Sequence, residues 1–304
     1  MATGVRNERF GRQSAPAETS FRHVLSRPSF YRLGFAVANR VPARILYRVA
    51  DFVGEASYFR YRKRGANVRG NLEKVFPERS PAEIAALARG TFRNFARYLV
   101  DYGRFQSAPS GELDGAIQDL EGGDHQEEAL RSGKGVILVT GHVGNWELGG
   151  LYFVRMGVKV NVVTLPDIAP RINAIREKYR GTYNIRTIVL DGTPFATVEM
   201  VASLRRGEMV AMLVDRWESE DGVRAEFFGR PHLFPRGPFA LSRATGAMIL
   251  PAFVVREGKG YKGVAERPFV ACGSEDEPYA QRIAQALERI IRRFPDQWYN
   301  FLPA

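Results

Sequence analysis

The chain of 304 residues is 45% hydrophobic and 25% charged, and it carries a formal net charge of +11. A chain of this length and composition can bury a large core, which argues against a disordered protein. Its single cysteine excludes an internal disulfide bond and a cysteine-rich zinc site. None of the four histidines belongs to a zinc-binding motif, so we expect no metal ion.

The positive charge is concentrated at the amino terminus. Residues 1–70 contain fourteen Lys and Arg and four Asp and Glu, so they carry +10 of the net +11. Such a segment is typical of proteins that bind a polyanion, either nucleic acid or the anionic surface of a membrane. Residues 1–25 lack the apolar centre of a secretory signal and are predicted to form a flexible tail. No stretch is apolar over the roughly 20 residues that a transmembrane helix needs.

Residues 26–105 are predicted to form basic, amphipathic helices. From residue 43 to residue 61, apolar residues recur at helical spacing and charged residues occupy the other side. Basic and aromatic residues in such a helix favour one that lies in a membrane surface. The alternative is a helix whose apolar side faces the protein core, and the pattern alone does not distinguish the two. The apolar residues are Ile45, Leu46, Val49, Phe52, Val53, Ala56 and Phe59.

From about residue 115, short apolar runs alternate with helical stretches. This alternation predicts a three-layer α/β fold over residues 106–304, with a mostly parallel or mixed sheet flanked by helices and packed with the amino-terminal helices as one domain. The G-x-G-x-x-G of residues 258–263 leads into a further strand, so it predicts a tight hairpin rather than a dinucleotide site. Strands are expected at 135–140, 159–165, 186–190, 209–214 and 248–255, and helices at 145–156, 170–180, 193–206, 236–245 and 277–294.

His142 directly follows the first of these strands, at the sheet edge where α/β proteins bind their ligands. Glu147 lies about one helical turn further on, close enough to accept a proton from one ring nitrogen and leave the other as a general base. No protein nucleophile accompanies the pair, because there is no G-x-S-x-G motif and Cys272 has no neighbouring His in the sequence. Acyl transfer to an acceptor hydroxyl fits this arrangement. The alternative is a His and a Glu that only satisfy backbone groups at a helix start.

The sequence "GHVGNWE" resembles the signature of the bacterial lipid A biosynthesis acyltransferases, a branch of the lysophospholipid acyltransferase superfamily. Further blocks agree in order, namely "NLEKVFPERS" before it and then "DRW", "FFG", "ATGA" and "QWY", so the resemblance covers roughly residues 65–300. It implies that His142 is the base and Glu147 its orienting partner. It also implies that the donor is an acyl thioester on acyl carrier protein or coenzyme A, with no cofactor besides this donor substrate.

The resemblance extends to other candidate residues. Asn145 and Trp146 match the motif and are expected to shape the site. Asp215 and Arg216 follow a predicted strand and would orient substrate or stabilise charge, unless they form only a surface salt bridge. Glu226 is a second carboxylate that could contact the base, and the alternative is a solvated acid at a strand end. The remaining candidates are Phe228 and Gly229 of "FFG", and Arg171 and Arg176, which would bind phosphate of the acceptor lipid or lie on a solvated helix face.

Two departures from the family leave the acceptor open. Many members begin with a membrane-spanning helix where this chain has arginine-broken amphipathic helices, and its end, "DQWYNFLPA", differs from the basic tail of the enterobacterial enzymes. We expect a peripheral enzyme on the cytoplasmic face of the bacterial inner membrane that acylates a glycolipid such as a lipid A precursor, with no nucleic-acid partner. Mannosyl-phosphoinositide or a lipoamino acid are alternative acceptors. Rival functions are a nucleic-acid-binding protein without enzymatic activity and a lipid esterase or thioesterase that uses the same base.

Overall fold

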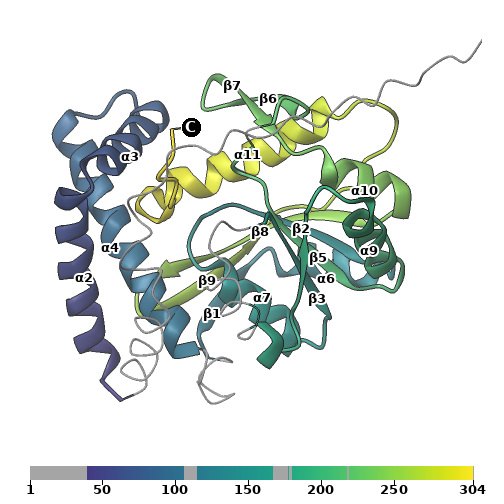
Figure 1. The fold of residues 1–304 in the computed structure, drawn as a ribbon, viewed down its shortest axis with the longest axis horizontal. Helices are drawn as coiled ribbons and strands as arrows, with labels where there is room; N and C mark the ends of the chain where they lie inside the picture. Colours follow the sequence, from purple (N-terminus) through teal and green to yellow (C-terminus); the bar gives the residue numbers. More distant parts are fainter. Residues whose placement is uncertain (1–39, 106–114, 167–176, 178–179, 218, 304) are drawn as a thin grey trace, which may run out of the picture.

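The computed structural model describes residues 40–105, 115–166, 177, 180–217 and 219–303. Its amino-terminal part is helical, as predicted: α2 (Ala43–Arg60), α3 (Arg62–Val75) and α4 (Pro81–Phe105) stand together on one side of the molecule (Figure 1). The predicted tail and the beginning of the predicted helical segment lie outside the described residues.

A seven-stranded sheet forms the centre of the molecule, which confirms the predicted α/β class. The strand order is β1-β9-β8-β2-β5-β3-β4, and all neighbouring strands are parallel except β8 and β9. Every residue of the central strand β2 is buried, because helices cover both faces of the sheet. The strands are β1 (Ile117–Glu121), β2 (Val136–Thr140), β3 (Val160–Thr164), β4 (Arg186–Val189), β5 (Met209–Leu213), β8 (Met248–Glu257) and β9 (Gly260–Ala265).

The sheet separates two apolar clusters, which makes the fold three layers deep. Alternate residues of β2 point to opposite faces, so Val136 and Leu138 belong to one cluster and Ile137 and Val139 to the other. Val136 and Leu138 pack with α6 (Gly123–Arg131) and α7 (Trp146–Arg155). Ile137 and Val139 pack with α9 (Pro194–Arg205), α10 (Gly237–Thr245) and α11 (Glu277–Arg293).

The predicted core strands and the helices at α7, α9, α10 and α11 are confirmed, whereas the predicted helix at 170–180 falls largely outside the described residues. The 258–263 segment is a hairpin, as predicted, because β8 and β9 are antiparallel and Glu257 pairs with Gly260. β1, α6 and the hairpin of β6 (Val223–Phe227) and β7 (Arg230–Phe234) were not predicted. β1 lies at the sheet edge and reads "IQDLE", so it lacks the continuous apolar run of the inner strands.

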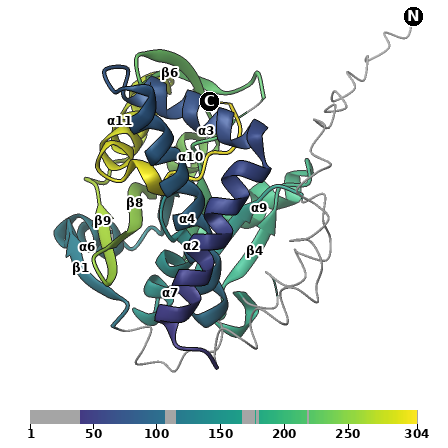
Figure 2. The same cartoon turned by 90° about the vertical axis from the view of Figure 1, so that its left-hand side faces the viewer.

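α2 packs on α4 through its small and polar side (Figure 2). Gly54 lies so close to α4 that a β-carbon there would stand 2.6 Å from the Cα of Arg93, and Asp51 pairs with Arg97 at 2.6 Å. The apolar stripe faces away from the part of the protein that the structure describes, so the interpretation that it faces the core of the α/β fold is wrong. The large apolar residues of the stripe, each between 46% and 75% exposed, are Ile45, Val49, Phe52, Val53 and Phe59.

Candidate active site

His142 lies in the loop between β2 and α7, at the carboxyl edge of the sheet. Backbone hydrogen bonds hold this loop: Tyr299 N–H donates to the carbonyl of His142 at 2.7 Å, and Gly144 N–H donates to the carbonyl of Gln297 at 2.9 Å. Gly144 has a φ of +63°, and a β-carbon there would stand 2.0 Å from the carbonyl oxygen of Val254, so only glycine fits. The side chain of His142 is 26% exposed, so solvent reaches a ring whose backbone is fixed.

Asp215 is the hydrogen-bond partner of His142. It follows β5, the parallel neighbour of β2, so the carboxyl ends of these two strands bring the residues together. Oδ1 of Asp215 lies 2.7 Å from Nδ1 of His142, and Oδ2 accepts a hydrogen bond from Nε1 of Trp298 at 3.1 Å. Burial raises the pKa of Asp215, but the charge and hydrogen bond of His142 and the charge of Arg216 outweigh it and hold this pKa well below its usual range. An ionised Asp215 accepts a hydrogen bond from Nδ1–H, which leaves Nε2 of His142 as the basic nitrogen.

Glu147, which we expected to orient His142, pairs with Arg180. Nη2 of Arg180 lies 2.8 Å from Oε1 of Glu147, and the two side chains are only 7% and 8% exposed. Trp146 lies beside the His142 ring, with 5.4 Å between the ring centroids. Glu147 is the next residue of α7, so its side chain projects about 100° further round the helix. Asp215 therefore occupies the position beside Nδ1 that we expected for Glu147.

Replacing Glu147 with Gln is expected to lower the free energy of unfolding by about 3 kcal/mol, because the change leaves the Arg180 charge buried without its partner. Urea denaturation measures this loss. The double variant Glu147→Gln, Arg180→Met is the matched control and should regain much of the stability, since it removes both charges. A large fall in kcat with unchanged stability would instead return the orienting role to Glu147.

Asn145 precedes α7 as its N-cap, and Trp146 is the first residue of the helix. The side chain of Asn145 caps the helix, because its Oδ1 accepts a hydrogen bond from Leu148 N–H at 3.0 Å. The ring of Trp146 meets His142 edge-on and stacks on Tyr98 at 4.7 Å between centroids. Both motif residues therefore support the loop that carries His142, one through the helix and one through direct ring contact.

Arg216 lies in the loop after β5, and Glu226 lies on β6. Arg216 donates from Nη2 to the carbonyl of Tyr299, so it binds the carboxyl-terminal segment that also holds His142. Glu226 is exposed on β6, where its backbone hydrogen-bonds with Gln281, which agrees with the alternative of a solvated strand end.

Phe228 and Gly229 form the turn between β6 and β7, with φ angles of +51° and +71°. The ring of Phe228 lies 6.1 Å from that of Trp298, so the turn packs on the residue that binds Asp215. Arg171 and Arg176 lie outside the described residues.

Sequence reasoning did not identify Trp298 or Arg180 as site residues. The contact between Trp298 and Asp215 joins distant parts of the chain, so no local pattern indicates it. The only sign of Trp298 in the sequence is its place in the "QWY" block. Within the part of the chain that the structure describes, no group of three His, Cys, Asp or Glu side chains is arranged to hold a metal ion.

Known proteins resemble this chain over most of its length. The model of the bacterial lipid A biosynthesis acyltransferases matches residues 16–304. A phosphatidylinositol mannoside acyltransferase of Mycobacterium tuberculosis is 28% identical over 257 residues, which cover 82% of this chain and 79% of the relative. The lipid A biosynthesis palmitoleoyltransferase and lauroyltransferase of Escherichia coli are 25% and 24% identical, and each alignment covers 85% of this chain and 84% of the relative. The protein is therefore an acyltransferase and belongs to the bacterial lipid A biosynthesis acyltransferase family.

Proposed function

We propose that this acyltransferase moves a fatty acyl chain from a thioester of acyl carrier protein or coenzyme A to a hydroxyl group of a glycolipid, with His142 as the general base. The 2.7 Å contact between Nδ1 of His142 and the buried carboxylate of Asp215 carries the proposal. This contact favours the ring form in which Nε2 is unprotonated, and the ring is partly exposed to an incoming substrate.

In the proposed reaction, Nε2 of His142 takes the proton of the acceptor hydroxyl as the hydroxyl oxygen attacks the thioester carbonyl carbon. The tetrahedral intermediate then breaks its C–S bond, and the imidazolium returns the proton to the thiolate that leaves. Asp215 stabilises the imidazolium between the two steps. The positive end of the α7 dipole lies just after His142 and favours the negative charge of the intermediate.

The acceptor is proposed to be a glycolipid such as a lipid A precursor. The relatives carry names that refer to lipid A and to phosphatidylinositol mannoside, so a mannosyl-phosphoinositide is the main alternative, and a lipoamino acid is the other. The test is to incubate the purified protein with palmitoyl-coenzyme A or palmitoyl-acyl carrier protein and each acceptor, and to measure the products by mass spectrometry. We expect one lipid class to gain the mass of one acyl chain.

The same measurement addresses the rival hydrolytic function. An esterase or thioesterase would release free fatty acid and leave every acceptor lipid unchanged, because water would be its only acceptor. That outcome would contradict the proposed transfer.

A small, mostly apolar cavity lies beside the loop that carries His142. It has a volume of about 30 Å³ and is lined by residues that include Leu138, Trp146, Phe153 and Val254. Trp146 also contacts His142, so the cavity adjoins the catalytic loop. Because the volume is far smaller than a fatty acyl chain, binding in this cavity requires the lining side chains to move apart.

We further propose that the exposed apolar stripe of α2 attaches the protein to the anionic cytoplasmic surface of the bacterial inner membrane. Arg48 and Arg60 are exposed and flank the stripe at helical spacing, which suits anionic lipid head groups. Among the helices that the structure describes, none combines the length and the apolar character needed to cross a bilayer.

Replacing Phe52 with Glu is expected to weaken binding to anionic vesicles by about tenfold or more, because the stripe would lose its most exposed aromatic ring and gain a negative charge. Co-sedimentation with phosphatidylglycerol vesicles measures this binding. Phe195→Glu is the matched control, since Phe195 is 80% exposed on α9 and lies outside the stripe. Equal losses in both variants, or tighter salt-dependent binding to DNA than to vesicles, would contradict the proposed membrane surface.

A further inference from the structure

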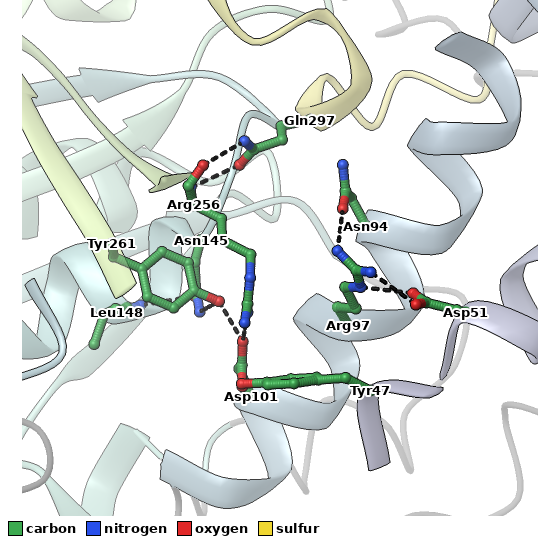
Figure 3. A network of polar contacts seen from close by, with 10 residues as sticks. All are labelled: Tyr47, Asp51, Asn94, Arg97, Asp101, Asn145, Leu148, Arg256, Tyr261 and Gln297. Carbon is green, nitrogen blue, oxygen red and sulfur yellow. Dashed lines mark hydrogen bonds and ion pairs between the residues drawn. The ribbon is translucent and has the colours of Figure 1, made fainter. Parts of the chain in front are cut away.

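A buried polar network centred on Asp101 joins the amino-terminal helices to the sheet (Figure 3). Asp101 lies in α4 and has no exposed surface. Its Oδ1 accepts a hydrogen bond from the hydroxyl of Tyr47 in α2 at 2.5 Å. Its Oδ2 accepts hydrogen bonds from Nη1 of Arg256 at 2.8 Å and from the hydroxyl of Tyr261. Three donors from three different elements therefore fix this carboxylate.

Tyr261 connects the fixed carboxylate to Asn145. Burial and the negative charge of Asp101 raise the pKa of Tyr261, so its hydroxyl keeps its proton and donates a hydrogen bond to Asp101. The same hydroxyl oxygen accepts a hydrogen bond from Nδ2 of Asn145 at 3.3 Å. The amide orientation is unambiguous, because Oδ1 of Asn145 is occupied by Leu148 N–H. The donors thus run in one direction, from Asn145 through Tyr261 to Asp101.

Asn145 is in a position to control the geometry of the catalytic loop. It lies three residues after His142, it caps α7, and it immediately precedes Trp146, whose ring contacts His142. Asn145 is only 1% exposed, so loss of the Tyr261 hydroxyl would leave its Nδ2 buried without an acceptor. A rotation of this side chain to find another partner would release the cap on Leu148.

A second arm of the network reaches the same loop. The backbone N–H and carbonyl of Arg256 both hydrogen-bond with the side chain of Gln297 at 2.8 Å. The carbonyl of Gln297 in turn accepts the hydrogen bond of Gly144 N–H. Two consecutive loop residues, Gly144 and Asn145, are therefore held by groups that Asp101 fixes.

We infer that Tyr261 is a positioning residue for the proposed acyl transfer. Through Asn145 it holds the start of α7, and thereby the position of the loop that carries His142. The expected effect on kcat rests on the proposed function. The expected loss of the Asn145 cap does not, and amide hydrogen exchange measures it without substrate.

The test compares Tyr261→Phe with Tyr47→Phe in the full-length protein. Both variants remove one hydroxyl that donates to Asp101, but only Tyr261 also contacts Asn145. Tyr261→Phe is expected to speed amide hydrogen exchange at Leu148 and to lower kcat by about tenfold or more with unchanged KM for palmitoyl-coenzyme A. Tyr47→Phe is expected to change the Leu148 exchange rate and kcat much less than Tyr261→Phe does, because Arg256 and Tyr261 still hold Asp101.

Equal Leu148 exchange in the two variants would overturn the inference, whether or not acyl transfer is detected. Failure of the wild type to acylate any acceptor would contradict the proposed function. The exchange comparison would still show whether Tyr261 holds the Asn145 cap. If Tyr261→Phe does not fold, Asn145→Ser tests the same link, because Ser keeps a capping oxygen and lacks the donor to Tyr261. It should lower kcat as expected for Tyr261→Phe, and a kcat equal to that of Tyr47→Phe would overturn the inference.

Discussion

Replacing His142 with Gln is expected to lower the rate of acyl transfer by a factor on the order of 10⁴, because the variant lacks a nitrogen that takes a proton from the acceptor hydroxyl. Gln is chosen because its amide N–H still donates to Asp215, so the buried carboxylate keeps a partner and the fold is retained. Single-turnover transfer, followed by mass spectrometry of the acylated lipid, measures the rate without interference from product release.

His125→Ala is the matched control for this variant. His125 lies in α6, and its Nδ1 contacts the backbone carbonyl of Ala265, so the ring has a local structural role. The control should transfer acyl chains at the wild-type rate. A folded His142→Gln variant that retains more than about a tenth of the wild-type rate would exclude His142 as the general base.

The second large effect is expected for Asp215→Asn, which should lower kcat by a factor on the order of 10³ through the wrong ring tautomer. Nε1 of Trp298 is only a donor, so the amide oxygen of the new Asn must face Trp298. Its NH₂ group then faces Nδ1 of His142 and requires Nδ1 to accept. The ring proton consequently moves to Nε2, the atom that should act as the base.

Removing the Trp298 donor tests this reasoning. In the double variant Asp215→Asn, Trp298→Phe, the amide is free to turn its oxygen towards Nδ1, so kcat should be higher than in Asp215→Asn alone. Circular dichroism checks that both variants are folded, because Trp298 is only 3% exposed. A double variant no faster than Asp215→Asn would show that Trp298 does not set the orientation of residue 215.

The fold and the position of His142 were predictable because they depend on local patterns. The inner strands are continuous apolar runs, and His142 directly follows one of them, which places it at the ligand-binding edge of a parallel sheet. The hairpin at 258–263 was also predictable, because its glycines lead into a strand and not into a helix.

The partner of His142 was not predictable in the same way. Glu147 is near in sequence, but Asp215 comes from β5, and only the order of strands in the sheet shows that β5 lies beside β2. Trp298 joins the site from the far end of the chain for a similar reason. The orientation of α2 was not predictable either, because it depends on Gly54, whose missing side chain allows close packing on α4. The apolar pattern of the helix does not show this.

The role of His142 as the general base is tested most directly by the protonation state of its ring, observed by long-range ¹H–¹⁵N NMR at neutral pH. The chain has four histidines, and His142→Gln assigns the signals by the loss of one set. We expect a ring that is protonated at Nδ1 and unprotonated at Nε2 in the wild type, and the reverse in Asp215→Asn. A wild-type ring that carries its proton on Nε2 would exclude His142 as the proposed base, because its unprotonated nitrogen, Nδ1, would face Asp215 and not the acceptor.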